Sequence, residues 1–183
     1  MSVTTLRQQG ALRVAPLPTE APWSLAVLGR PAWSAAVTGT PAPQGSKSAR
    51  VIAGRAQMYE DNPQTRTWRD TVHWAARSSL PGGWVPLDGP LVLDFVFSMP
   101  RLKSLPKTRR VLPAVKPDVS KLARAVEDSL TTAGVIKDDA AIVDYRRLAK
   151  VYARDLLDAD ALPVPGVVIR AWRVPDSHRG ALG

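Results

Sequence analysis

The sequence predicts an α/β fold of the α+β layer type, in which a small mixed β-sheet carries two main helices. Two observations lead to this prediction. Segments with strand-like alternation lie near both ends and in the middle of the chain, and two segments with helical periodicity lie between them. The 183 residues, 45% of them hydrophobic, are enough for one domain with a sizeable core. This order of elements favours helices packed on a sheet.

The N-terminal elements follow from local patterns. Alternation predicts a first strand over residues 33–39, and frequent Pro, Gly and Ser predict a loop over 40–50. Short strands are possible near Val51 and Met58. A helix is predicted over about 63–79, because a proline at its first position suits a helix start. Its inner stripe comprises Trp68, Val72, Ala75 and Ala76.

The middle strand, 91–97, has the clearest alternation. One face carries Leu91, Leu93, Phe95 and Phe97, and the other carries Val92, Asp94 and Val96. A helix over about 118–132 follows a long loop, and Gly134 ends it. A strand over 141–153 comes next, and the last strand covers 163–172. In the strand over 141–153, one face is predicted to carry Val143, Tyr145, Ala149 and Val151, and the other Asp144, Arg146 and Lys150.

The two ends of the chain are predicted to lie outside the folded domain. Residues 1–30 resemble a flexible arm, 31–174 form the domain, and 175–183 form a tail. No apolar run is long enough to cross a bilayer, and prolines interrupt any candidate signal core. We therefore expect a protein of the cytoplasm, in a bacterial or phage-infected cell, with no membrane partner.

Charge and residue usage narrow the function. The formal net charge is +9, which favours a polyanionic partner such as nucleic acid, although surplus charge also serves solubility. The loop over 100–117 contains six basic residues and no acidic one, as a phosphate-binding arm or a solvated loop does. Cysteine is absent and only two histidines occur, so any metal would be a hard cation held by carboxylates.

One segment contains the residues that metal-assisted chemistry needs. Asp118 begins a helix, and Lys121, Arg124 and Asp128 follow at helical spacing on its polar face. Asp138 and Asp139 follow the helix end. Carboxylates that hold a divalent cation beside a basic side chain are suited to phosphodiester hydrolysis.

Each of these residues also has a purely structural interpretation. Asp118 is a natural N-cap, and Asp138-Asp139 is common turn chemistry. Arg124 and Asp128 form an i,i+4 pair of the kind that supports a helix surface. For Asp118 and Asp139 to meet, the strand that follows must return alongside the helix start.

The segment resembles the signature of RusA-type Holliday junction resolvases. The matching pieces are Pro117-Asp118-Val-Ser120-Lys121, Arg124, Asp128-Ser-Leu-Thr131, Ala133-Gly134 and Asp138-Asp139-Ala-Ala-Ile-Val-Asp144-Tyr145. Upstream pieces are Gly39-Thr-Pro-Ala-Pro-Gln-Gly-Ser-Lys47, Trp68-Arg69, Pro86-Leu-Asp-Gly-Pro90 and a strand that ends in Met99-Pro100. The resemblance spans about residues 33–172. Its upstream pieces are similar to the N-terminal part of phage-type members of the family.

The resemblance implies an endodeoxyribonuclease that resolves branched DNA, with Mg²⁺ or Mn²⁺ as cofactor. Asp118 and Asp139 would bind the metal with help from Asp138 and Ser120, and Arg124 stands where the family has an essential lysine. Arginine keeps the charge but changes its geometry. Ser120 occupies the place of a second catalytic aspartate, and a serine hydroxyl is a poorer cation ligand. Glu60, Asp94, Asp128 and Asp138 are candidates to replace that carboxylate.

The family also implies a homodimer, whose two-fold symmetry matches that of a four-way junction. Candidate DNA-binding residues are Lys47, Arg50, Arg101, Lys103, Lys107, Arg109, Arg110, Lys116 and Lys121. Two other functions stay open. One is a branched-DNA binder of the same fold that cuts weakly because of Ser120. The other, from charge alone, is an RNA-binding domain, which leaves the aspartate pattern unexplained.

Overall fold

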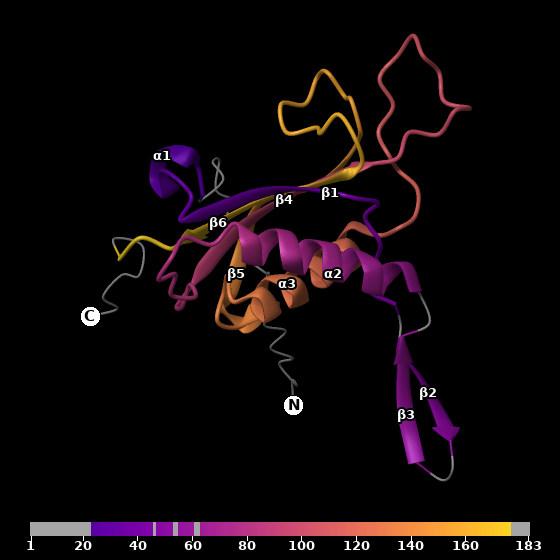
Figure 1. Cartoon of the computed structure of the whole chain (residues 1–183). Coiled ribbons are helices and arrows are strands. Elements are labelled where there is room, and N and C mark those ends of the chain that lie inside the picture. The colour runs from indigo at the N-terminus through magenta and orange to yellow at the C-terminus, as the bar shows by residue number, and fades with distance from the viewer. Residues whose placement is uncertain (1–22, 46, 53–54, 61–62, 177–183) are drawn as a thin grey trace, which may run out of the picture.

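A four-stranded mixed sheet forms the centre of the computed structural model, which describes residues 23–45, 47–52, 55–60 and 63–176 (Figure 1). The strand order is β1-β6-β4-β5, with the bounds β1 (Trp33–Thr38), β6 (Gly166–Arg173), β4 (Leu91–Met99) and β5 (Ile142–Tyr152). β6 is antiparallel to both β1 and β4, whereas β4 and β5 are parallel. The predicted fold class, a small mixed sheet with two main helices, is confirmed.

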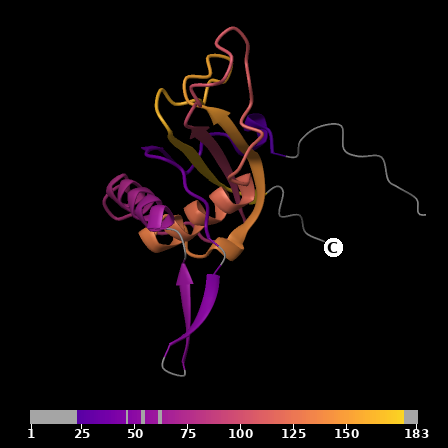
Figure 2. The same cartoon turned by 90° about the vertical axis from the view of Figure 1, so that its right-hand side faces the viewer.

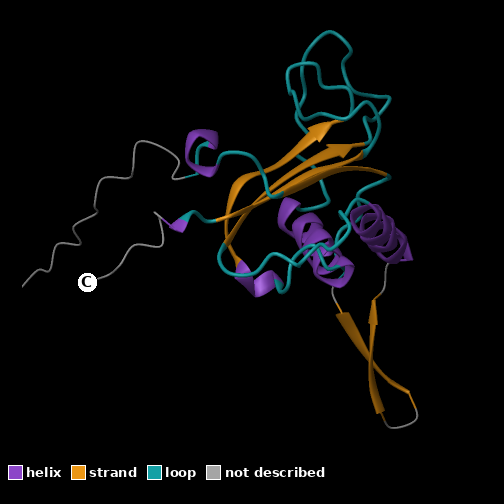
Figure 3. Ribbon diagram, turned by 60° about the vertical axis from the view of Figure 1, so that its left-hand side comes forward, coloured by secondary structure: helices purple, strands orange, loops and turns teal. Residues whose placement is uncertain are grey.

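Two helices, α2 (Pro63–Ser78) and α3 (Val119–Ala133), cover one face of this sheet (Figure 3). Their apolar stripes face Phe95 and Phe97 of β4 in one core, and the buried stripe residues include Trp68, Val72, Leu122, Val126 and Leu130. Each fully buried side chain of this size contributes about 1.5–3 kcal/mol. Gly134 ends α3 in a left-handed conformation that favours glycine, with φ of 76°.

The pairing of β5 with β4 has two register shifts, at Val143 and at Arg146, and the second changes which of the later β5 side chains face the helices. Along the pairing with β4, Leu93 lies opposite Tyr145, but Asp94 lies opposite Arg147, so Arg146 is an extra residue. A single extra residue reverses the in–out alternation of everything after it. Both Arg146 and Arg147 therefore lie on the side of Asp94, away from the helices.

The bulge overturns one prediction about β5. Leu148 packs against the same core as Tyr145, and Tyr152 is buried in that core. The predicted placement of Ala149 and Val151 on the face of Tyr145 is therefore wrong. Lys150, predicted for the opposite face, reaches the start of α3 instead.

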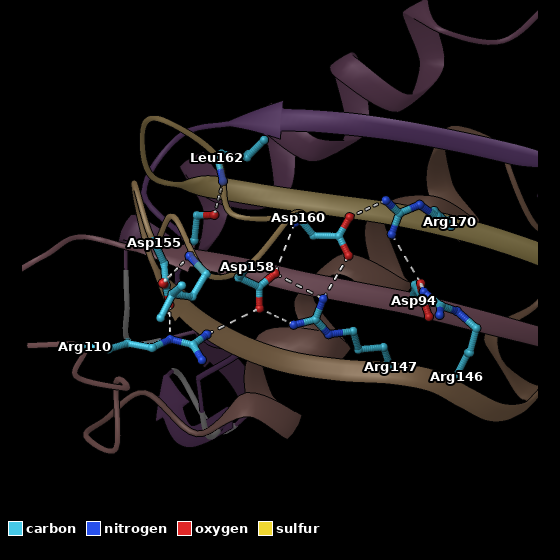
Figure 4. A network of polar contacts seen from close by, with 11 residues as sticks. Asp94, Arg110, Arg146, Arg147, Asp155, Asp158, Asp160, Leu162 and Arg170 are labelled. Atoms are coloured by element: carbon cyan, nitrogen blue, oxygen red, sulfur yellow. Dashed lines mark hydrogen bonds and ion pairs between the residues drawn. The ribbon is translucent and has the colours of Figure 1, made fainter. Parts of the chain in front are cut away.

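The face of the sheet opposite the helices carries a network of ion pairs (Figure 4). Asp94 is 0% exposed and accepts hydrogen bonds from Arg146 and Arg170. Arg170 also donates to Asp160, and Arg147 donates to Asp158 and Asp160. The arginine hydrogen bonds hold the pKa of Asp158 and of Asp160 below the ordinary range. The network thereby anchors the loop over 153–165 to β5 and β6.

A second small core lies on this face near the N-terminal end of the described chain. Leu28 of α1 (Leu25–Leu28) packs with Val92 and Trp172, and the Trp23 indole donates to Asp144 over 2.7 Å. The part of the predicted arm from residue 23 onwards thus lies against the sheet. Residues 1–22 of the arm and 177–183 of the tail lie outside the described residues.

A two-stranded antiparallel hairpin, β2 (Lys47–Ile52) and β3 (Arg55–Glu60), extends away from the body (Figure 2). The loop predicted over 40–50 is therefore shorter, because the first strand of the hairpin begins at Lys47. The side chains of Lys47, Arg50 and Glu60 lie outside the part of the structure that is described. Within the described residues, no helix has the length and apolarity that a bilayer crossing requires.

Candidate active site

Asp118 occupies the N-cap position of α3, as the sequence predicts, but does not act as a capping side chain. Its backbone is extended, with φ of −67° and ψ of 138°, and its carboxylate makes no cap hydrogen bond. The side chain is exposed. Because this carboxylate does not accept hydrogen bonds from the first-turn amides, its oxygens remain available to bind a cation.

Lys150 fixes the chain just before Asp118. Its ammonium donates to the carbonyl oxygens of Val115 and Pro117, each over 2.7 Å. Sequence reasoning missed this residue, because the bulge at Arg146 is what turns Lys150 toward α3. The contact joins β5 to the end of the basic loop, directly before the N-cap residue Asp118.

Asp138 and Asp139 form the start of a short 3-10 helix, η1 (Asp139–Ala141), directly before β5. Asp138 caps it, with Oδ1 accepting from the Ala140 amide over 2.8 Å. This confirms a local turn role for Asp138. The side chain of Asp139 is exposed.

A glutamate–tyrosine pair that the sequence analysis did not single out lies close to Asp139. The Tyr145 hydroxyl donates to Glu127 of α3. Burial raises the pKa of Glu127 against the effect of this hydrogen bond, and the charge of Asp139 raises it further. Burial and the same pair raise the pKa of Tyr145. Asp139 therefore belongs to the electrostatic environment of the middle of α3.

The exposed face of α3 carries the cations. Lys121 and Arg124 are exposed, and the charge of Arg124 lowers the pKa of Glu127. Asp128 has partners on other elements, an ion pair with Arg69 at 3.4 Å and a hydrogen bond from Gln44 over 2.9 Å. Its carboxylate thus ties α2 and the segment before β2 to α3, a role that the predicted pair with Arg124 does not include.

Asp118 and Asp139 belong to different elements. Asp118 is the N-cap residue of α3, whereas Asp139 begins η1 and its charge contributes to the raised pKa of Glu127. No group of three acidic or histidine side chains able to hold a metal occurs among the described residues. Of the carboxylates considered as replacements for the missing one, Asp94 is on the other face of the sheet, and Asp128 and Asp138 have the partners given above.

The basic loop over 100–117 connects the C-terminal end of β4 to Asp118. Its cations are exposed, and they are Arg101, Lys103, Lys107, Arg109, Arg110 and Lys116. Arg110 pairs with Asp155 at 2.9 Å, which ties this loop to the loop over 153–165. A cleft of 750 Å³ separates the two loops and is lined by Arg101, Lys107, Arg109 and Arg154 among others. Such a surface attracts phosphates.

The chain was compared with models of protein families. The family described as endodeoxyribonuclease RusA matches residues 38–155, which run from the end of β1 to the loop after β5. The matched region includes Asp118, Arg124, Asp139 and Lys150. A search of curated proteins found no match.

Proposed function

Because the chain belongs to the RusA family of endodeoxyribonucleases, we propose that it cuts four-way DNA junctions with the help of a divalent cation at Asp118 and Asp139. The observation that carries this is the family match across the segment that holds both aspartates. The free carboxylate at the start of α3 supports it, since a capping role would have occupied that side chain. The family makes the chain an enzyme that hydrolyses phosphodiester bonds in DNA.

The oxygen donors near the two aspartates suit Mg²⁺ or Mn²⁺. Both carboxylates are exposed, Asp138 has a second oxygen that is not used by its cap, and Ser120 adds a hydroxyl. Hard cations take oxygen ligands and complete their shells with water and substrate phosphate. When bound, the cation supplies charge neutralisation and Lewis acidity at the scissile phosphate.

The chain's own cations have separate roles in this proposal. Arg124, whose guanidinium is exposed, would stabilise the negative charge that develops on the phosphate. The basic loop over 100–117 holds the DNA backbone without reading its sequence. We further propose a homodimer, which presents two sites to the two opposed strands of a junction, and a role in phage or prophage recombination in the cytoplasm.

The test is a cleavage assay on a synthetic four-way junction with Mg²⁺, Mn²⁺ and Ca²⁺ in parallel. We expect paired nicks with Mg²⁺ or Mn²⁺, and no nicks after chelation. A linear duplex of the same sequence is the substrate control. If no divalent cation supports cleavage at any concentration while the junction is bound, the nuclease proposal is wrong.

Ser120 favours a second candidate function, a branched-DNA binder that cuts weakly. The hydroxyl adds no negative charge, and the described residues contain no cluster of three acidic or histidine side chains that could hold a metal. On this view Ser120→Asp raises the cleavage rate by about tenfold or more, because an added anionic ligand strengthens cation binding. Efficient cutting by the wild-type protein contradicts this second candidate.

Lys150 gives a prediction that is specific to this structure. Lys150→Met removes the ammonium that ties down the Val115 and Pro117 carbonyls, and we expect cleavage to slow by about 10- to 100-fold, as for residues that orient metal ligands. We also expect Lys150→Met to need a higher Mg²⁺ concentration than wild type to reach its half-maximal cleavage rate.

The comparison variant is Lys150→Arg, which keeps a donor and restores part of the rate. Junction affinity without metal measures whether the basic loop still binds. A wild-type Mg²⁺ dependence in Lys150→Met means that Lys150 only stabilises the fold.

A further inference from the structure

The groove between α2 and α3 contains an exposed tryptophan. Trp74 is 65% exposed, although α2 buries Trp68 and Val72 from its opposite stripe. The groove has a volume of 520 Å³, and its lining includes Arg66, Arg69, Asp70, His73, Trp74 and Thr132. Trp74 therefore contributes little to the core, and its indole faces a cavity whose other walls are polar.

The tryptophan ring has an aromatic neighbour in the groove. The His73 ring contacts the indole edge-on, with 5.0 Å between centroids and 88° between planes. His73 is itself fixed by Thr132 of α3, with 3.2 Å between Nδ1 and Oγ1. A preset ring loses little conformational entropy on binding, so its exposed surface is available for a stacking contact.

The groove offers one exposed guanidinium to a phosphate group. Arg66 is exposed on the same helix, two turns before Trp74 and about 12 Å from it along the axis. Arg69 lies between them and holds Asp128, one turn from Arg124. Asp70 and Asp128 balance the two arginines in charge, so the groove carries no excess of positive charge. Arg66 is the exposed guanidinium outside the Arg69–Asp128 ion pair, and a single guanidinium suits contact with one phosphate rather than with the phosphates on both sides of a duplex.

We propose that this groove binds an unpaired base of a DNA strand, which stacks on Trp74 while Arg66 contacts a neighbouring phosphate. A free base offers a π-face that bases inside a duplex do not, and base–aromatic stacking tolerates any sequence. The groove borders the same helix as Arg124, so the bound strand lies beside the candidate active site. The choice of DNA rests on the proposed function, and the preference for an unpaired strand rests on the groove.

The test uses the full chain with a labelled oligothymidylate and a labelled blunt duplex, without divalent metal. We expect Trp74→Ala to weaken oligothymidylate binding by about tenfold, within the range for loss of one stacked base. Duplex affinity stays within about twofold of wild type. Trp74→Phe retains most of the affinity, because phenylalanine still stacks. Quenching of tryptophan emission by the oligothymidylate is lost in both variants.

Val85→Ala is the matched control, since it removes another exposed apolar side chain, 71% exposed, outside the groove. An equal loss on duplex and oligothymidylate overturns the proposal, as does an unchanged affinity for both. A change in oligomeric state of Trp74→Ala assigns the groove to a second copy of the chain and also overturns it. Junction cleavage with metal is measured separately, so this proposal and the nuclease proposal fail independently.

Discussion

Asp139→Asn is expected to reduce junction cleavage by about 10²- to 10³-fold while junction binding persists, as when one group that stabilises a transition state is lost. Asparagine keeps the size of the side chain but removes the charge that would hold a divalent cation. Asp139 is exposed, so the change leaves the core intact. Single-turnover cleavage under saturating protein measures the rate, and a gel-shift assay without metal measures binding.

The neighbouring residue supplies the control for charge alone. Asp138→Asn removes the same charge one position earlier and keeps an oxygen that can accept from the Ala140 amide. A much smaller loss in Asp138→Asn assigns the effect to the position of Asp139. Equal losses in the two variants mean that Asp138 contributes to cation binding as much as Asp139 does, and cleavage by Asp139→Asn within about threefold of wild type removes Asp139 from the site.

The elements that the sequence predicts well are those with an uninterrupted period. β4 has nine consecutive buried residues, and its alternation separates a helix side from the side of Asp94. α3 has a regular apolar stripe that ends at a glycine, so its bounds are close to the predicted ones. In such segments local pattern and tertiary packing agree, and the prediction needs no knowledge of the partners.

β5 shows why other features of the fold could not be predicted from the sequence. Its side chains alternate plausibly in a straight strand, and nothing in the residue types marks Arg146 as the extra residue. The bulge depends on how β5 pairs with β4, which lies more than forty residues earlier. The contact of Lys150 with the start of α3 is a consequence of this pairing, and therefore stayed hidden in the sequence.

The candidate site likewise contains residues that the sequence reveals and residues that only the structure reveals. The order of Asp118, Arg124 and Asp139 along the chain resembles a family signature, so these positions are accessible from sequence. Glu127 and Tyr145 were not identified, because a glutamate on a helix and an aromatic residue in a strand have ordinary roles in the surface and the core. Only the packing of α3 against β5 brings them together as a half-buried pair close to Asp139.

Asp94→Ala is expected to destabilise the protein by about 3 kcal/mol, because it leaves two arginines without their shared carboxylate. Arg146 and Arg170 both donate to Oδ2 of Asp94, and their side chains are 22% and 26% exposed. Because the arginines are partly exposed, water can solvate them after the substitution. The expected loss of folding free energy therefore lies at the lower end of the range for broken buried ion pairs. Urea unfolding of the two proteins measures the difference.

The loss of stability in Asp94→Ala should be larger than the loss caused by breaking an exposed ion pair. Asp88 pairs with Lys137 at 2.7 Å, with side chains 61% and 67% exposed, so Asp88→Ala should cost less than about 1 kcal/mol. Two atoms of the buried site, Oδ1 of Asp94 and Nε of Arg146, have no hydrogen-bond partner, so the wild-type arrangement already carries part of the desolvation cost. If Asp94→Ala unfolds at the same urea concentration as Asp88→Ala, that cost cancels the attraction. Asp94 would then stabilise the fold no more than an exposed aspartate does, and the anchoring of the loop over 153–165 would depend on Arg147 with Asp158 and Asp160.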